Sequence, residues 1–168
     1  MPHSSDQSEH SKHHMNCCGL SYERLEDHPF DAFEKNVLTL ARLFFLSFHL
    51  PKRQAWVSAF QFGEDRFGKS SGAAVAKGVM EIVNAMRSTR TSGFGYCDAF
   101  GAECSASLTR EERYLISTLH HMRNQNPTAA AMNAMLLCEG ADTTAYMARI
   151  DQLIALTSDA IQPSEVSV

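Results

Sequence analysis

The 168-residue sequence predicts an all-α fold, a compact bundle of about six helices with one long ordered loop. Three observations lead to this fold class. Apolar residues recur at helical spacing through most of the chain, capping and stop signals separate the segments, and no segment alternates as a strand does. Because 44% of the residues are hydrophobic, a chain of this length can bury the core of one ordinary domain.

The two ends of the chain are polar. Residues 1–16 lack periodicity and carry half of the histidines, so we expect a disordered tail there: His3, His10, His13 and His14. A solvated tail is the simplest interpretation, and a metal-sequestering arm is the alternative, because imidazole is a common metal ligand. A short C-terminal tail, 163–168, leaves 17–162 as the predicted helical domain.

The first predicted helix starts at the Asp27-His28-Pro29 junction and runs to about His49, because Pro51 cannot continue it. Its early half carries a single apolar stripe, whereas residues 43–46 are apolar all round. Such a segment is typical of a helix that other helices enclose. We therefore interpret it as the central core helix, with a dimer interface as the alternative.

Two more helices are predicted before residue 91. The second covers about 52–67, with Gly68 as its stop signal, and its aromatic and small residues fall at helical spacing: Trp56, Ala59, Phe60 and Phe67. Ser70 or Ser71 is expected to cap the third helix, which reaches about Arg90. Its apolar residues form one inward stripe: Val75, Val79, Ile82, Val83 and Met86.

Basic groups give only weak signs of nucleic-acid or phosphate binding. Arg87 and Arg90 lie in the last turn of the third helix, where cations suit the helix dipole, and we prefer this role to phosphate binding. The third helix follows a turn, as in a helix-turn-helix, but its exposed positions are poor in base-reading groups: Ala73, Ala76, Lys77 and Glu81. The net charge of −4 also disfavours a nucleic-acid partner. A helical DNA-binding regulator is thus the second alternative.

Residues 91–108 have no helical or strand period and form a loop longer than most. Its three aromatic residues, Phe94, Tyr96 and Phe100, indicate an ordered and packed loop. The glycines at 93, 95 and 101 do not match a dinucleotide-binding fingerprint, because the third is displaced and no strand precedes them.

Three helices are predicted after the loop. Thr109 and Glu112 form a capping box that opens the first, which ends near Asn124. The other two are bounded by capping, proline and glycine signals: Asn126, Pro127 and Gly140 for one, and Asp142 or Thr143 with Pro163 for the other. The middle helix is expected to be lined by Ala130, Met132, Met135 and Leu136.

Cysteines and histidines indicate one candidate metal site. Cys97 and Cys104 lie in the loop at a spacing wider than that of usual zinc ligands, and His120 and His121 lie on the helix that follows. Thiolates and imidazoles suit zinc, and a metal would explain an ordered irregular loop. The first alternative is therefore a metal- or thiol-dependent protein, with a structural zinc or redox-sensing site at these four residues.

Several features argue against a metal-binding or catalytic role for the cysteines and histidines. Adjacent residues on a helix point about 100° apart, so His120 and His121 do not easily share one ion. Cys17 and Cys18 are two adjacent cysteines with no further ligand motif beside them, which is a weak sign of a metal site. Cys138 lies in an apolar helix, where a cysteine usually packs as a small core residue. No family signature of nucleophilic catalysis surrounds Cys97 or Cys104.

Neither a signal peptide nor a membrane-spanning run is found, since the longest apolar stretch, 37–48, is interrupted by polar residues. We expect a cytoplasmic protein with reduced cysteines. The chain has five cysteines, and an odd number argues against a closed disulfide framework. The favoured function is a non-enzymatic regulatory or protein-interaction module that can self-associate, with a protein partner or a second copy as its partner. No pattern names a small-molecule ligand.

Overall fold

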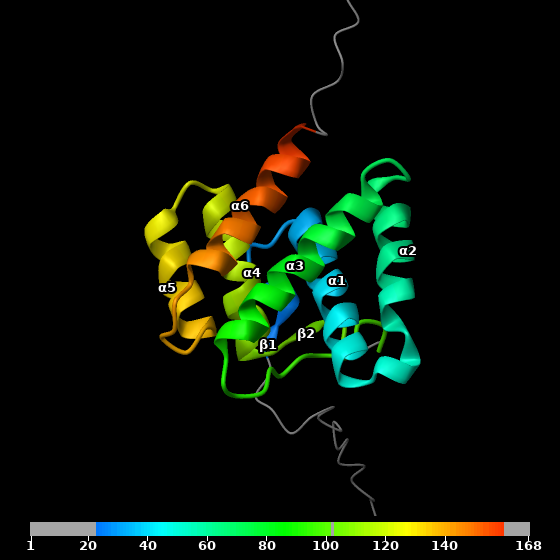
Figure 1. Ribbon diagram of the computed structural model, residues 1–168, viewed down its shortest axis with the longest axis horizontal. Helices are drawn as coiled ribbons and strands as arrows, with labels where there is room; N and C mark the ends of the chain where they lie inside the picture. Colours follow the sequence, from blue (N-terminus) through cyan, green and yellow to red (C-terminus); the bar gives the residue numbers. More distant parts are fainter. Residues whose placement is uncertain (1–22, 102, 160–168) are drawn as a thin grey trace, which may run out of the picture.

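The computed structural model describes residues 23–101 and 103–159, which form a bundle of six α-helices (Figure 1). The helices are α1 (Ala32–His49), α2 (Ala55–Phe67), α3 (Gly72–Thr89), α4 (Arg110–Arg123), α5 (Pro127–Leu137) and α6 (Thr144–Asp159). The all-α prediction is confirmed. The predicted tails, 1–16 and 163–168, and the adjacent Cys17 and Cys18 lie outside the described residues.

Helix α1 lies at the centre, packed against α2, α3 and α4. Its apolar segment is buried, as predicted for a core helix, and includes Leu40, Leu43 and Phe44. The helix begins later than the sequence predicts, at Ala32 with Asp31 as its N-cap rather than near Pro29. Asp31 accepts a hydrogen bond from the backbone N–H of Glu34 at 2.8 Å, and this capping box fixes the start.

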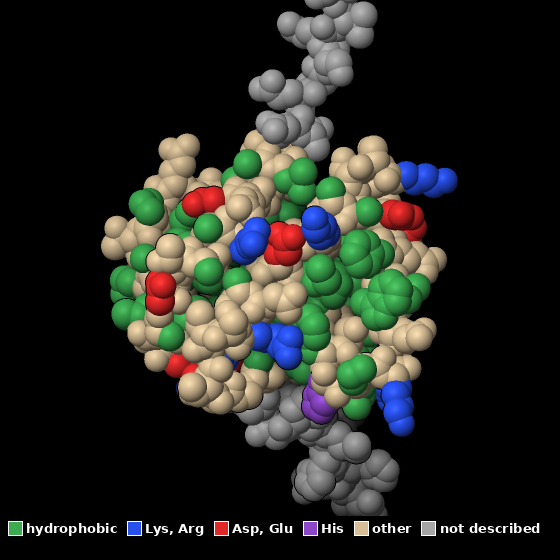
Figure 2. Space-filling model, viewed as in Figure 1, with side chains coloured by type: hydrophobic (Ala, Val, Ile, Leu, Met, Phe, Trp, Pro, Cys, Tyr) green, Lys and Arg blue, Asp and Glu red, His purple; other side chains and the backbone are tan. Residues whose placement is uncertain are grey.

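Helices α2 and α3 form a hairpin whose backbones almost touch at two glycines. A Cβ atom on Gly72 would lie 2.5 Å from the Cα of Glu64, and one on Gly63 would lie 2.7 Å from the carbonyl oxygen of Gly72. Only glycine allows so close a crossing. Trp56, which the periodicity groups with the apolar residues of α2, is exposed, and hydrophobic side chains gather on the α2 side of the molecule (Figure 2).

Helix α5 buries a different face from the one its sequence predicts. Its buried residues are Ala130, Ala134 and Leu137, whereas Met132, Met135 and Leu136 are exposed. The helix is apolar all round, so periodicity could not identify its inner face. Small alanines let it pack closely on α4, and this contact decides the orientation. None of the described helices is long and apolar enough to cross a membrane.

The described part of the loop before α4 packs against the core, as predicted. It ends in strand β2 (Ser107–Leu108), which pairs antiparallel with strand β1 (Glu23–Arg24). These strands have two residues each, too short to show an alternating pattern in the sequence. Phe94 and Tyr96 pack against the core, but Phe100 is 64% exposed. Two of the three aromatic residues therefore anchor the loop.

Candidate functional site

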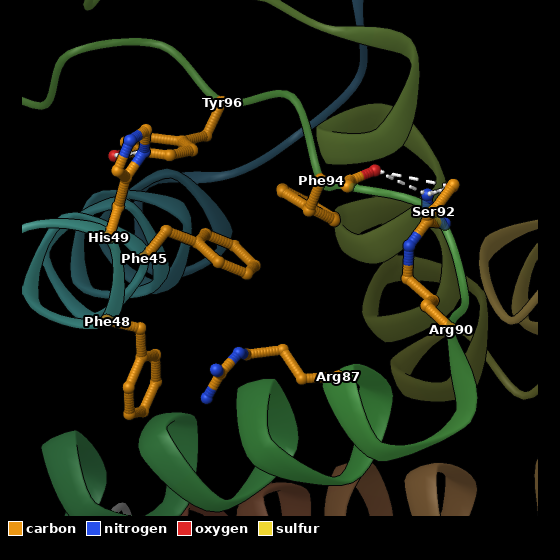
Figure 3. Close-up of a pocket in the computed structure, with 9 residues that line it drawn as sticks. Phe45, Phe48, His49, Arg87, Arg90, Ser92, Phe94 and Tyr96 are labelled. Carbon is orange, nitrogen blue, oxygen red and sulfur yellow. Dashed lines mark hydrogen bonds between the residues drawn. The ribbon is translucent and has the colours of Figure 1, made fainter.

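A pocket with aromatic and basic walls lies between the C-terminal ends of α1 and α3 and the loop that follows α3 (Figure 3). Its volume is about 360 Å³. The residues that line it are Phe45, Phe48, His49, Arg87, Arg90, Ser92, Gly93, Phe94 and Tyr96. None of these lining residues is acidic, although the chain has a net charge of −4. The pocket is therefore locally positive on an acidic protein.

Stacked rings form one wall of the pocket. The ring of Phe45 lies 4.0 Å from that of Phe94 and 5.6 Å from that of Tyr96, both nearly parallel to it. The Tyr96 hydroxyl lies 3.4 Å from Nδ1 of His49. Because Phe45, Phe48 and His49 are three and four residues apart on α1, they face the same side. The end of α1 thus presents an aromatic surface to the loop.

Arg87 is the exposed cation of the pocket. Its guanidinium lies 4.0 Å from the centroid of the Phe48 ring, which orients it across the gap between α3 and α1 (Figure 3). Within the described part of the chain, no acidic side chain pairs with it. A stacked guanidinium without a carboxylate partner retains its full hydrogen-bonding capacity for an anion.

Arg90 is the buried cation of the pocket, with a side chain only 6% exposed. It donates to the carbonyl oxygens of Leu137 and Gly93 and to Oγ of Ser92, the last two at 3.0 and 2.9 Å. It also forms an ion pair of 3.2 Å with Glu139. Its Nε, by contrast, is buried without an acceptor among the described residues. Such a donor is costly unless a further group satisfies it.

Glu139, in the turn between α5 and α6, brings its carboxylate to the residues beside Arg90. This carboxylate accepts hydrogen bonds from Thr91 N–H at 2.8 Å, Thr91 Oγ1 at 3.0 Å, Ser92 N–H at 3.2 Å and the Ser92 hydroxyl. The Ser92 hydroxyl, followed by the two backbone N–H groups, lowers the pKa of Glu139 to about 2. Glu139 is therefore an anion at neutral pH.

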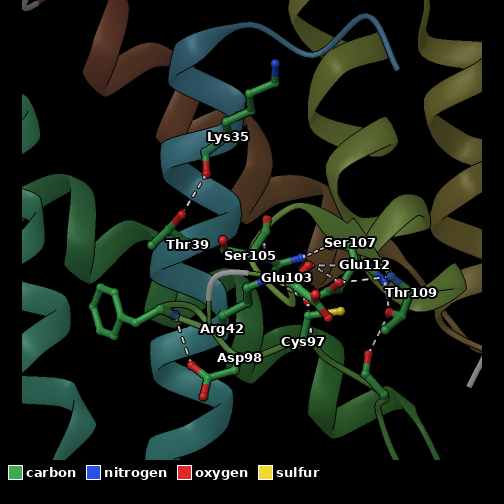
Figure 4. Close-up of polar contacts among 12 residues, drawn as sticks. Lys35, Thr39, Arg42, Cys97, Asp98, Glu103, Ser105, Ser107, Thr109 and Glu112 are labelled. Atoms are coloured by element: carbon green, nitrogen blue, oxygen red, sulfur yellow. Dashed lines mark hydrogen bonds and ion pairs between the residues drawn. The ribbon is translucent and has the colours of Figure 1, made fainter. Parts of the chain in front are cut away.

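A buried ion pair between Arg42 and Glu112 is hydrogen-bonded to the loop that precedes α4 (Figure 4). Arg42 of α1 donates to both carboxylate oxygens of Glu112 of α4, at 2.7 and 3.0 Å, and to the carbonyl oxygen of Ser105. Glu112 also accepts from the backbone N–H groups of Cys97 and Thr109, at 2.9 and 3.0 Å. This network binds the chain at Cys97, Ser105 and Thr109, and so positions the aromatic wall of the pocket.

The structure separates the roles of the two loop cysteines proposed as metal ligands. Cys97 is buried beside Glu112, as its backbone bond shows. Cys104 is disulfide-bonded, which contradicts the expectation that the cysteines are reduced. An odd number of cysteines excludes only complete pairing, so it did not exclude a single bond. In this form Cys104 offers no thiolate to a metal.

The two histidines of the proposed metal site lie on α4, away from any cluster of ligands. His120 Nδ1 lies 3.1 Å from Oε2 of the buried Glu34, and Arg123 donates to the other oxygen at 2.7 Å. The ring of His121 meets that of His120 edge to face. In the ranges described, no group of three or more metal-binding side chains is suitably placed, and the metal site stays a prediction.

The pocket is the feature that the residue pattern did not reveal. The position of Arg87 near the end of α3 is compatible with the helix-dipole role, but its stacking on Phe48 depends on how α1 and α3 meet. The available signal was the proximity of a basic helix end to a loop rich in aromatic residues. Comparisons of the chain with protein-family models, with curated proteins and with solved structures find no match.

Proposed function

We propose that the protein is a non-enzymatic regulatory binding module whose ligand is a small organic anion with a planar apolar part. The observation that carries this proposal is Arg87, an exposed guanidinium stacked on Phe48 at the edge of an aromatic pocket and not paired with an acid among the described residues. Guanidinium groups bind carboxylates and phosphates in a bidentate manner. The anionic group of the ligand would pair with Arg87.

The rest of the pocket supports a planar ligand. Phe45, Phe94 and Tyr96 offer ring faces, on which flat apolar groups stack. A volume of about 360 Å³ suits a molecule with one ring and one charged group. Among the lining residues, the Ser92 hydroxyl donates to Glu139, which is a weak base because its pKa is about 2, and His49 contacts the phenol of Tyr96 rather than a serine or cysteine. Binding rather than catalysis is therefore the chemistry favoured.

The test is a binding titration with probe compounds. Benzoate and phenyl phosphate supply a ring and an anion, and benzyl alcohol supplies the ring alone. We expect the anionic probes to shift the amide NMR signals of Phe94 and Tyr96 in a saturable way, with benzyl alcohol much weaker. Arg87→Gln should weaken benzoate binding about tenfold or more, because a hydrogen-bonded charge pair is lost.

Arg66 provides a matched control. It is also exposed and stacked, 5.3 Å from the centroid of the Phe62 ring on α2. Arg66→Gln removes the same charge from a site elsewhere on the molecule and should leave the affinity unchanged. Equal affinities in Arg87→Gln and Arg66→Gln, or the absence of saturable shifts with either anion, would refute the proposal.

A second candidate function is self-association through α5. Helix α5 carries no charged residue and exposes Met132, Met135 and Leu136 by 59%, 52% and 51%. An uncharged apolar face meets no electrostatic repulsion from its own copy, and so we propose a second copy of this chain as the occupant. Sedimentation equilibrium should show a dimer that Met135→Glu dissociates and Leu156→Glu on α6 does not. A monomeric wild-type protein would contradict this candidate.

A further inference from the structure

The turn between α1 and α2 presents apolar and basic side chains together at one end of the helix pair. We name this surface the α1–α2 corner, and its five exposed residues are Leu50, Lys52, Arg53, Trp56 and Val57. The three apolar side chains, at 50, 56 and 57, are exposed by 40%, 50% and 46%. The corner shares no residue with the lining of the pocket and is therefore a separate surface of the molecule.

The α1–α2 corner is positive on an acidic protein. Residues 35–63, which contain it, include no Asp or Glu, although the whole chain has 19 acidic residues and a net charge of −4. Among the described residues, Lys52 and Arg53 form no ion pair with an acidic side chain. Two uncompensated cations beside exposed apolar side chains favour a partner that is both anionic and apolar.

Backbone hydrogen bonds fix the shape of the corner. The N–H groups of Arg53, Gln54 and Val57 donate to the carbonyl oxygens three residues earlier, at 2.9, 3.1 and 2.9 Å. The turn lies at the outer edge of the molecule (Figure 1), and in the same part of Figure 2 a basic side chain projects beside apolar ones. An ordered turn loses little conformational freedom on binding, and its projecting shape suits a soft, flat surface better than a rigid protein face.

We propose that the α1–α2 corner docks the protein on the surface of a bilayer that contains anionic lipids. Trp56 and its apolar neighbours would lie at the level of the headgroups, because the indole ring is amphipathic and tryptophan is enriched at membrane–water interfaces. Lys52 and Arg53 would pair with the lipid anions. Surface docking needs no membrane-spanning helix, and none is found among the described helices. A nucleic-acid partner is disfavoured, because two cations neutralise few phosphates.

Trp56 is the only tryptophan of the chain, so its fluorescence reports directly on the corner. The experiment titrates the full-length protein with vesicles of phosphatidylcholine alone and of phosphatidylcholine mixed with phosphatidylserine. With the mixed vesicles we expect the Trp56 emission to move to shorter wavelength and to be quenched by lipids brominated near the headgroup. Phosphatidylcholine alone should have little effect, and added salt should weaken the binding.

Two double variants test the charges. Lys52→Gln with Arg53→Gln should lower the partition coefficient for the mixed vesicles about tenfold or more, because two surface cations are lost. Arg66→Gln with Lys69→Gln removes the same charge from exposed positions at the other end of α2 and should bind like the wild type. All four side chains are exposed, so these substitutions leave the core unchanged.

Vesicle flotation tests the apolar part of the corner without fluorescence. Trp56→Ala should bind the mixed vesicles about tenfold more weakly or worse, whereas Met132→Ala, on the exposed face of α5, should bind like the wild type. The proposal is overturned if the mixed vesicles leave the Trp56 emission unchanged, if phosphatidylcholine alone shifts it equally, or if both double variants lose affinity to the same extent. An equal shift with soluble polyglutamate would indicate an acidic protein partner and would also overturn it.

Discussion

The Nε atom of Arg42 lies 2.7 Å from Oε1 of Glu112, and the two side chains are 2% and 0% exposed. Arg42→Met would leave the Glu112 carboxylate buried without its cation. We expect a loss of about 3–5 kcal/mol in the free energy of unfolding, measured by urea denaturation. Arg149→Met, which breaks an exposed pair with Glu81, should cost no more than about 1 kcal/mol. Similar losses in both variants would contradict a special role for the buried pair.

The pKa of Glu139, lowered to about 2 by Ser92 and the adjacent amides, predicts the acid response of the α5–α6 turn. Because the folded-state pKa is below the ordinary value of 4.5, the contribution to stability is present above pH 4.5 and is lost as the pH falls towards 2. Carbon-detected NMR should give a midpoint near 2. Ser92→Ala should raise it and Ser88→Ala should not, whereas a wild-type midpoint near 4.5 would refute the assigned contacts.

The burial of Tyr146 predicts how the stability of the protein changes with pH in the alkaline range. It is fully buried, its hydroxyl donates to the carbonyl oxygen of Leu115 at 3.4 Å, and burial raises the pKa of Tyr146 above its ordinary value of 10. Its contribution is therefore complete below pH 10 and is lost as the pH rises further. Between pH 9 and 12, Tyr146→Phe should lose less stability than the wild type. The half-buried Tyr114→Phe serves as control, and identical pH profiles for wild type and Tyr146→Phe would contradict the prediction.

The glycine crossing of α2 and α3 predicts a strong effect of a single methyl group. Gly72→Ala would place Cβ 2.5 Å from the backbone of Glu64, so the helices must separate. We expect a loss of about 1–3 kcal/mol or more in thermal or urea unfolding. Gly93→Ala meets no atom within 4 Å and should be nearly neutral. If Gly72→Ala is as stable as Gly93→Ala, the close approach is not present in solution.

Local signals in the sequence identified the helices well, because a cap is decided by neighbouring residues. Thr109 with Glu112, and Asn126 before Pro127, cap α4 and α5 as predicted. The predictions that failed concern features that are determined by contacts between residues distant in the sequence. The sequence shows that Glu112 can cap a helix, but not that it also receives Arg42 from another helix.

The same distinction explains what was missed at the candidate site. Arg87 and Phe48 are remote in the sequence and meet only because α1 and α3 end side by side. The exposed face of α5 was misassigned because a helix that is apolar all round has no preferred side until a neighbour is present. Periodicity describes one helix at a time, whereas a pocket belongs to several.

The crossing at Gly63 and Gly72 also constrains how this chain can change over evolutionary time. An added side chain at either position meets the backbone of the other helix, so neither position can enlarge unless the hairpin shifts. Substitutions elsewhere in α2 and α3 can be absorbed by repacking of flexible side chains. A pair of glycines nine residues apart across a short turn should therefore persist in diverged descendants of this chain after most of its surface has been replaced.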